Sequence, residues 1–342
     1  MKNMNIIDMH CDTISLIHTN SKGHSFQKDG TTNSSYENVI EEKMNLKKND
    51  LHVDLEKLRL ANAKAQFFAL FVEYDYLKKI KQTPYNYFNL MYETLMKNLD
   101  ENKDSIAIAR NYDEMEKNFN ENKISAFLTI EEGGAIEGKL ERIEEVYNKG
   151  VRLITITWNH ENELGYPNAV AKFMNKGLKK KGIETIERMN ELGMLVDVSH
   201  LSDGGFWDVV KHSKKPFVAS HSNARALASH PRNLTDDMIK AIANAGGTIG
   251  INYFGRFLSN RDDNISYVSD IVNHIKYIRN IGGDDVLSLG GDFDGVDSTL
   301  EMANVGEMNK LLHALKKDKF SDDFIEKLWE KNVTRVIKDV LR

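Results

Sequence analysis

Histidine and carboxylate residues end five short segments whose other residues are typical of buried β-strands. The first segment, 6–12, carries His10 and Asp12. The later segments end in the other candidates: Glu131, Glu132, His200, His221 and Asp292. Imidazole and carboxylate groups are ordinary zinc ligands, and a carboxylate can bridge two ions. The set therefore predicts a hydrolytic site with one or two metal ions.

His10 and Asp12 occupy alternate positions of the first strand, so both side chains can reach one metal ion. The same alternation turns Cys11 to the opposite face, where we expect a buried thiol under a helix rather than a ligand or nucleophile. A second His-x-Asp triplet runs from His52 to Asp54. It precedes an amphipathic stretch, so we interpret it as a turn and helix cap.

Glu132 precedes Gly133 and Gly134, and glycine allows backbone and ligands to approach closely at a strand end. We therefore expect Glu132 to face the site. Glu131 is the competing choice. It points to the opposite side of the strand unless a bulge reverses the alternation.

Two further charged residues suit substrate chemistry. Asp292 ends the last strand, where a carboxylate can hold a metal-bound water and shuttle its proton. Asp294 follows closely and either adds a second acid or caps the next turn. Arg232 lies in the loop after the sixth strand, where it either holds a substrate carboxylate by a two-point contact or lies at the surface.

The order of apolar runs and helical stretches predicts a closed (β/α)8 barrel of the TIM type. From residue 124 onward the two kinds of segment alternate, which is typical of parallel sheets. Eight strands are expected, at 6–10, 65–72, 125–131, 151–157, 194–199, 216–220, 248–253 and 286–291. Catalytic groups of such barrels lie at the carboxyl ends of the strands, where the candidates fall.

A single catalytic domain accounts for residues 1–342. A barrel of about 250 residues plus insertions fits this length, and 41% of the residues are hydrophobic. We expect a long polar loop at about 19–50, which follows the first strand and can cover the site. We also expect a C-terminal helix at about 321–341, packed on the barrel wall.

Charge and hydropathy argue against nucleic-acid and membrane partners. The net charge of −5 provides no basic footprint. The longest strongly apolar run, 67–72, is far short of the ~20 residues that a membrane helix needs. We expect neither a signal peptide nor a lipid anchor, and the single cysteine excludes an internal disulfide. A cytoplasmic protein is the expectation.

Over nearly the whole chain the motifs resemble the renal, or membrane, dipeptidase family of zinc peptidases. The blocks that carry the resemblance follow the family's order: 8–12, 66–68, 132–134, 197–200, 220–224, 232–233 and 291–295. The resemblance implies an amidohydrolase-like barrel that hydrolyses dipeptides. It is closest to cytoplasmic bacterial members, and it implies a homodimer.

The resemblance also implies a pair of zinc ions. His10 and Asp12 hold one ion. His200 and His221 hold the other. Glu132 and a hydroxide bridge the two ions, and the hydroxide attacks the peptide carbonyl.

Substrate-handling roles follow from the same resemblance. Arg232 matches the arginine that receives the terminal carboxylate of the dipeptide. Asp292 matches the acid that handles the proton passed from the hydroxide to the leaving amine. The family's strand-four histidine aligns with Trp158, so we expect His160, two positions later, to contact and polarise the scissile carbonyl.

Lactone hydrolysis or deamination on the same dinuclear site is the alternative, because a fold does not fix a reaction. The best-known enzymes of that kind usually carry His-x-His on strand one and often a modified lysine on strand four. This chain has His10-x-Asp12 instead, and no lysine within 153–158. Dipeptide hydrolysis is therefore favoured, and a barrel that binds metal without catalysis is disfavoured.

Overall fold

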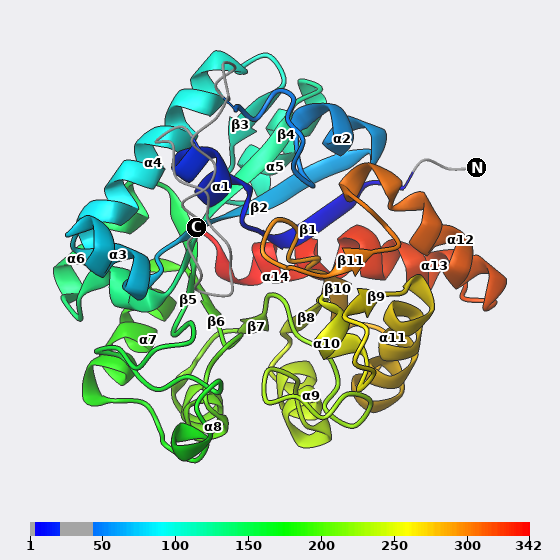
Figure 1. The fold of residues 1–342 in the computed structure, drawn as a ribbon. Helices are drawn as coiled ribbons and strands as arrows, with labels where there is room; N and C mark the ends of the chain where they lie inside the picture. The colour runs from blue at the N-terminus through cyan, green and yellow to red at the C-terminus, as the bar shows by residue number, and fades with distance from the viewer. Residues whose placement is uncertain (1–3, 21–43) are drawn as a thin grey trace.

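A closed barrel of parallel strands, surrounded by helices, forms the molecule (Figure 1). The computed structural model describes residues 4–20 and 44–342. Its barrel strands are β1 (Ile6–Cys11), β2 (Ala63–Phe71), β4 (Ile124–Glu131), β5 (Val151–Thr155), β6 (Leu195–Asp197), β7 (Val218–Ala219), β8 (Thr248–Ile251) and β10 (Leu287–Leu289). They pair in the order β2-β1-β10-β8-β7-β6-β5-β4, and β2 pairs with β4 to close the ring. The predicted fold class is confirmed.

Among the described residues, three short strands lie outside this ring. The strand β3 (Ile106–Ile108), which the sequence did not predict, pairs with the start of β4 before β5 begins its own pairing at Leu128. Strands β9 (Ile265–Ser266) and β11 (Thr299–Leu300) pair with each other. Several barrel strands are shorter than expected, because the chain leaves the ladder early to build the loops at the carboxyl ends.

Helices follow most strands and cover the outside of the barrel. The helices are α1 (Thr13–Asn20), α2 (Leu55–Leu60), α3 (Tyr74–Ile80), α4 (Pro84–Glu101), α5 (Tyr112–Asn120), α6 (Leu140–Asn148), α7 (Lys180–Leu192), α8 (Asp203–His212), α9 (Asp236–Asn244), α10 (Gly255–Leu258), α11 (Val268–Gly282), α12 (Asn309–Lys317), α13 (Asp322–Glu326) and α14 (Asn332–Val340). Short 3₁₀ turns are η1 (Gly133–Ile136), η2 (Ala171–Phe173) and η3 (Val305–Glu307), and η4 (Lys327–Lys331) is a π-helical turn. No helix within the described ranges is long and apolar enough to cross a bilayer.

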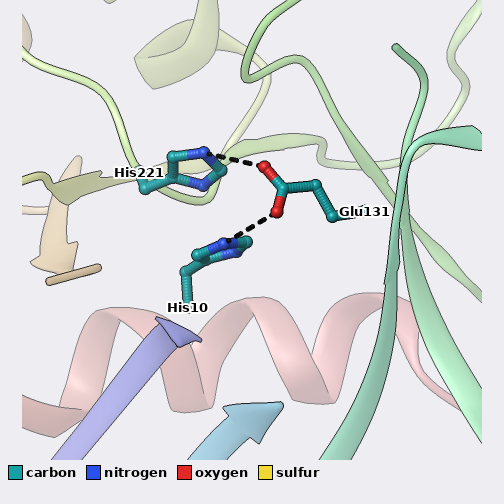
Figure 2. A group of neighbouring side chains, drawn as sticks. All are labelled: His10, Glu131 and His221. Atoms are coloured by element: carbon teal, nitrogen blue, oxygen red, sulfur yellow. Dashed lines mark ion pairs between the residues drawn. The ribbon is translucent and has the colours of Figure 1, made fainter. Parts of the chain in front are cut away.

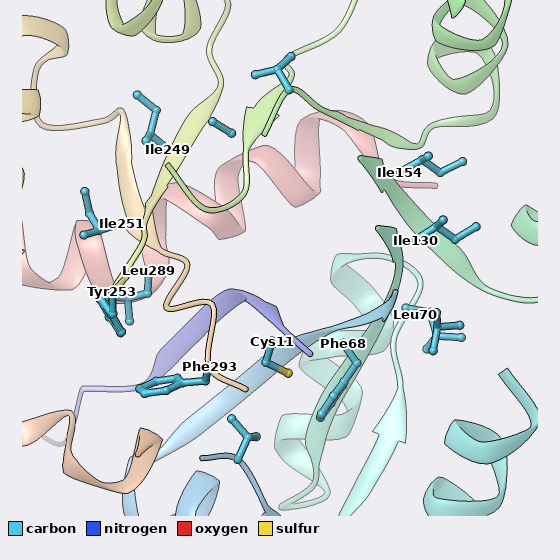
Figure 3. Close-up of a cluster of buried hydrophobic side chains, with 14 of the residues drawn as sticks. Cys11, Phe68, Leu70, Ile130, Ile154, Ile249, Ile251, Tyr253, Leu289 and Phe293 are labelled. Atoms are coloured by element: carbon cyan, nitrogen blue, oxygen red, sulfur yellow. The ribbon is translucent and has the colours of Figure 1, made fainter. Parts of the chain in front are cut away.

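Two apolar clusters lie on opposite faces of the strands. The larger lies between strands and helices, and Figure 3 shows part of it, with Cys11, Phe68 and Ile130 among its members. The smaller joins inward side chains, such as Phe67 and Phe127, to one face of α14.

The C-terminal helix crosses one end of the barrel. The sequence predicted that it packs on the barrel wall, and this prediction is wrong. Val336 and Ile337 of α14 join the inward cluster, and α14 passes across the barrel in red in Figure 1. Asn332 donates to the carbonyl of Asp284, and Arg335 donates to that of Gly247. Both carbonyls precede strands, so α14 closes the end where the strands begin.

Part of the expected long loop lies outside the described residues. Residues 21–43 belong to that part. The helix α1 already occupies 13–20, directly after β1. The chain is described again from Met44, ahead of α2.

The inward cluster predicts a large stability cost for a cavity at Phe127. Its ring is fully buried and stacks on Phe67 with ring centroids 4.6 Å apart. Phe127→Ala should lower the free energy of unfolding by about 3–5 kcal/mol. Leu60→Ala, at a side chain that is 78% exposed, should change it by less than about 0.5 kcal/mol. Guanidinium unfolding of both variants checks this; equal losses would contradict it.

Candidate active site

The carboxylate of Glu131 lies between histidines from three strand ends, two of which, His10 and His221, are drawn in Figure 2. Its Oε2 lies 3.4 Å from Nε2 of His10. Its Oε1 lies 3.2 Å from Nε2 of His200 and 3.6 Å from Nε2 of His221. All four side chains are buried. The two oxygens of one carboxylate thus face different histidines.

Two aspartates complete the cluster on the His10 side. Nε2 of His10 lies 3.5 Å from Oδ2 of Asp12 and 3.8 Å from Oδ1 of Asp292. Burial alone would lower the pKa of His10, but the negative charges of Glu131 and Asp12 raise that pKa well above its usual value. The cluster therefore attracts positive charge strongly.

Glu132, which we expected to face the site, points elsewhere, and this expectation is wrong. The side chain of Glu131 points inward, as that of Phe127 does, because alternate residues of a strand share a face. Leu128 and Ile130 point outward and belong to the outer cluster. The backbone turns at Glu132, where φ is +82°. The alternation of the strand therefore runs unbroken to Glu131, and no bulge is needed to bring that residue to the site.

Glu132 instead anchors the loop after β5. Its carboxylate accepts hydrogen bonds from the amide N–H of Gly134 at 2.7 Å, from that of Trp158 at 2.9 Å, and from the side chain of Asn162. Burial raises its pKa to about 7, although these bonds oppose the rise. The glycines serve this turn: a Cβ at Gly134 would lie 1.7 Å from the Tyr74 hydroxyl.

A bulge in β1 orients His10 and Asp12. Asp8 pairs with Gln66 and Cys11 with Phe68, so three steps along β1 match two along β2. The side chains of Ile7 and Met9 point inward. The extra residue of the bulge reverses the alternation after Met9, so that His10 and Asp12 point inward in their turn. Cys11 is consequently buried in the outer cluster, which confirms its predicted place.

Two buried aspartates, whose role the sequence did not reveal, hold the strand ends together. Asp197 accepts backbone N–H bonds from Ser199 at 3.0 Å and Ser220 at 2.8 Å. Asp8 accepts them from His10 at 2.9 Å and from Gly291 at 3.0 Å. Each aspartate precedes a site histidine in an otherwise apolar strand, and this pattern was the available signal.

Hydrogen bonds at Nδ1 determine which nitrogen of two histidines faces the site. The Ser220 hydroxyl donates to Asp197 at 2.6 Å, so Nδ1–H of His221, 2.8 Å from that hydroxyl, must be the donor. Nδ1 of His200 lies 3.1 Å from Oδ1 of Asn159, an acceptor. Both Nε2 atoms therefore carry lone pairs, and they lie 3.0 Å apart. Such an arrangement requires a proton or a cation between them.

The donor spacing fits metal ions. Two ligands bound to one tetrahedral zinc ion at about 2.0–2.2 Å lie roughly 3.4 Å apart. The donor atoms in this cluster lie between 3.0 Å apart, for His200 and His221, and 3.8 Å apart, for His10 and Asp292. The hydrogen bonds at Nδ1 of His200 and His221 are also of the kind that orients metal-binding histidines.

Arg232 lies beside the cluster and is buried rather than at the surface. Its Nη2 donates to the carbonyl of His221 at 3.1 Å, and its Nη1 donates to Ser222 at 3.4 Å. Burial lowers its pKa to about 10, against the charges of Asp292 and Glu131. Asp292 accepts a hydrogen bond from Asn252 at 2.9 Å. A buried guanidinium next to a cluster of this kind is suited to bind an anion.

The structure does not bring His160 into the cluster. Its Nε2 lies 3.5 Å from Glu73 and 3.8 Å from Asp75, and its ring packs beside Trp158. Trp158 in turn packs beside His200, with ring centroids 6.1 Å apart. The carbonyl-polarising role of His160 stays a prediction, and it requires the ring to leave Glu73.

The second His-x-Asp triplet serves the structural purpose that we predicted. Asp54 is the N-cap of α2 and accepts the amide N–H of Lys57. Nδ1 of His52 accepts the amide N–H of Asp294 at 3.0 Å. Asp294 also receives a hydrogen bond from Thr13, so it holds the loop after β10 against the start of α1.

Two cavities adjoin the cluster. The larger, about 330 Å³, includes Asp12, Phe71 and Glu73 in its wall. The smaller, about 150 Å³, includes His200 and Asp292. Both share residues 295–297, so the cluster lies where the two cavities meet.

Comparison with known proteins identifies the family. The model of the membrane dipeptidase family, peptidase family M19, matches residues 1–342. The chain belongs to this family. The resemblance seen in the sequence is thus confirmed, and the protein is a hydrolase of a metallopeptidase family, with a metal cofactor.

Several relatives support this assignment. The chain is 37% identical over 229 residues to an uncharacterized protein from the pqqA 5′ region of Klebsiella pneumoniae. This alignment covers 64% of this chain and 84% of the Klebsiella protein. It is 29% identical over 307 residues to an uncharacterized dipeptidase of Schizosaccharomyces pombe, and this alignment covers 84% of this chain and 72% of the dipeptidase. A Rhodobacter sphaeroides metallopeptidase, solved with a phosphinate mimic of L-Ala-D-Ala, shares the fold with a TM-score of 0.83, 20% identity, and coverage of 99% and 100%.

The hydrogen bonds around Asp197 predict a variant that loses metal affinity with little loss of fold. In Asp197→Asn the amide can donate to Ser220, whose hydroxyl then donates to Nδ1 of His221 and leaves the proton on Nε2. Metal affinity should fall about 10–100-fold. Chelator competition measures the affinity, and nitrogen NMR of the metal-free protein reports the tautomer of His221.

Thr155→Val is the matched control. It removes one hydrogen bond, of 2.6 Å, from the same carboxylate but keeps the link from Asp197 through Ser220 to His221. Its cost should be about 1 kcal/mol of stability with unchanged metal affinity. An equal loss of affinity in both variants would refute the tautomer argument.

Proposed function

We propose that this protein hydrolyses dipeptides at a pair of zinc ions bridged by Glu131. The observation that carries the proposal is the carboxylate of Glu131, whose oxygens lie 3.4 Å from His10 on one side and 3.2 Å from His200 on the other. A carboxylate placed in this way can hold two ions at once. Family membership supports peptide hydrolysis as the reaction.

Each ion would have its own ligands besides Glu131. His10 and Asp12 would hold one, and His200 and His221 the other. When bound, the ions would activate a water molecule and polarise the peptide carbonyl. The protein's own contribution is to hold these donors in a buried site in the correct tautomers.

Asp292 would handle the proton. Its Oδ2 is held by Asn252 at 2.9 Å, and its Oδ1 lies on the side of His10. From there it can accept the proton of the attacking water and pass it to the amine that leaves. This transfer requires a carboxylate that keeps its position between the two events, which the Asn252 bond provides.

Arg232 would bind the free carboxylate of the substrate. Its guanidinium lies beside Asp292 and over the ring of Phe257, which lines the smaller cavity. A dipeptide anchored there would place its peptide bond at the cluster and its amino-terminal residue toward Asp12 and the larger cavity. The Rhodobacter sphaeroides metallopeptidase, which was solved with a dipeptide mimic, supports a substrate of this size.

Lactone hydrolysis and deamination fit this site less well. Neither substrate needs to carry a free carboxylate, whereas a buried guanidinium costs free energy unless it binds an anion. The homodimer and the cytoplasmic location stay predictions.

Metal analysis tests the bridge. Protein loaded with zinc should hold about two ions per chain. Glu131→Gln should hold at most one and lose turnover by at least ~10²-fold, because one bridging charge is gone. Glu132→Gln should keep both ions, although a weaker bond to Trp158 lowers its stability. Elemental analysis after desalting decides, and loss of zinc from the Glu132 variant alone would restore Glu132 as the bridge.

Substrate amidation tests Arg232. The wild type should cleave a dipeptide at least ~10²-fold better, in kcat/KM, than the same dipeptide with an amidated carboxyl end. Arg232→Lys keeps the charge but loses the planar fork, so it should lower kcat/KM for the free dipeptide about 10–100-fold. It should change kcat/KM for the amide little, because the interaction is already absent. An equal effect on both substrates would disprove the contact.

A further inference from the structure

A second group of metal-ligating side chains lies at the rim of the larger cavity. Nε2 of His160 lies 3.5 Å from Oε1 of Glu73 and 3.8 Å from Oδ2 of Asp75. One donor atom from each of the three lies within 4.8 Å of the other two. The side chain of His160 is 33% exposed and that of Glu73 is 12% exposed, so the group is half-buried but open to solvent.

Two of the three donors, Glu73 and His160, are held in place by their surroundings, whereas the side chain of Asp75 is 57% exposed. Glu73 is the N-cap of α3, and its two oxygens accept the amide N–H groups of Asp75 and Tyr76 at 2.7 and 2.6 Å. The ring of His160 stacks on Tyr74 at a centroid distance of 5.9 Å and an angle of 17°. Glu73 and His160 therefore have little side-chain entropy left to lose when a ligand binds.

Charge at the group favours a cation. The hydrogen bond to Glu73 is the main cause that raises the pKa of His160. Burial opposes ionisation of Glu73, but the hydrogen bonds from His160 and from the α3 amides lower its pKa. The two carboxylates thus already stabilise positive charge on two groups, a proton on the imidazole of His160 and the ammonium of Lys78, which lies 2.8 Å from Asp75. A metal ion would replace that proton.

We propose that Glu73, Asp75 and His160 bind one further zinc ion, separate from the pair at Glu131. One imidazole and two carboxylates suit a borderline divalent ion, and the spacing of 3.5–3.8 Å is close to that of ligands on one tetrahedral ion. A water molecule could supply a fourth ligand, because the side chains of His160 and Asp75 are 33% and 57% exposed. Solvent exposure makes this site weaker than the buried pair.

Such an ion would join two loops at the mouth of the active site. Glu73 and Asp75 lie where β2 leads into α3, and His160 lies in the loop after β5. That loop also carries Trp158, which lines the smaller cavity, and Glu73 lines the larger one. The site therefore connects walls of both cavities without using any ligand of the buried pair.

Zinc titration of the loaded enzyme tests the proposal. Protein that already holds its buried ions should take up one more zinc ion per chain in equilibrium dialysis with elemental analysis. His160→Ala and Asp75→Asn should each weaken this additional binding about tenfold or more. His212→Ala is the matched control, because His212 is 25% exposed and lies 3.9 Å from a single carboxylate, Glu187. It should bind zinc as the wild type does.

Hydrogen exchange then locates the ion. Excess zinc should slow amide exchange at 73–76 and 158–162 in the wild type and not in His160→Ala. The proposal is overturned if millimolar zinc adds no ion, if the His212 control loses as much binding as His160→Ala, or if exchange slows elsewhere instead. The baseline number of buried ions is measured on the same protein, so a failure of the two-ion prediction is seen separately.

Discussion

The structure depends on keeping the carboxylate of Glu131 buried among imidazoles. A lone carboxylate inside a barrel would cost many kcal/mol, and the cost falls only when positive charge is nearby. His200 and His221, with lone pairs directed inward, do not supply that charge, and His10 supplies it only when its ring is protonated. The barrel therefore creates a strongly negative and nucleophilic interior at one end, and a cation is the partner that makes this interior stable. Family membership implies a metal cofactor, and the spacing of the donors in this cluster suits a metal ion.

Strand ends must be distorted to direct these side chains inward, and the structure stabilises the distortions locally. His200, Asp292 and Glu132 have φ of +67°, +57° and +82°, in the left-handed region that costs non-glycine residues about 1–3 kcal/mol each. The aspartates Asp8 and Asp197 oppose this cost. Each carboxylate accepts backbone N–H groups from two neighbouring strand ends, so the flared backbone has partners without any metal ion.

The sequence predicted what depends on repeating patterns and missed what depends on single residues. Alternation and helical spacing predicted the eight barrel strands, because each must bury an inward and an outward face. The same rule, followed from Phe127, would have selected Glu131; the adjacent glycines misled the choice because they belong to the turn that Glu132 anchors. The bulge of β1 leaves no mark in composition, since it depends on pairing with β2. Helix α14 is amphipathic, and amphipathicity alone does not distinguish a helix on the wall from one across the end.

Because α14 closes one end of the barrel, it determines from which side small molecules can enter and leave. Side chains of this helix fill the end where the strands begin, so a molecule cannot pass through the barrel axis. Substrate must arrive, and both amino acids must depart, on the side where the strands end. The two amino acids formed from one dipeptide therefore leave on the same side of the barrel, where both cavities adjoin the cluster.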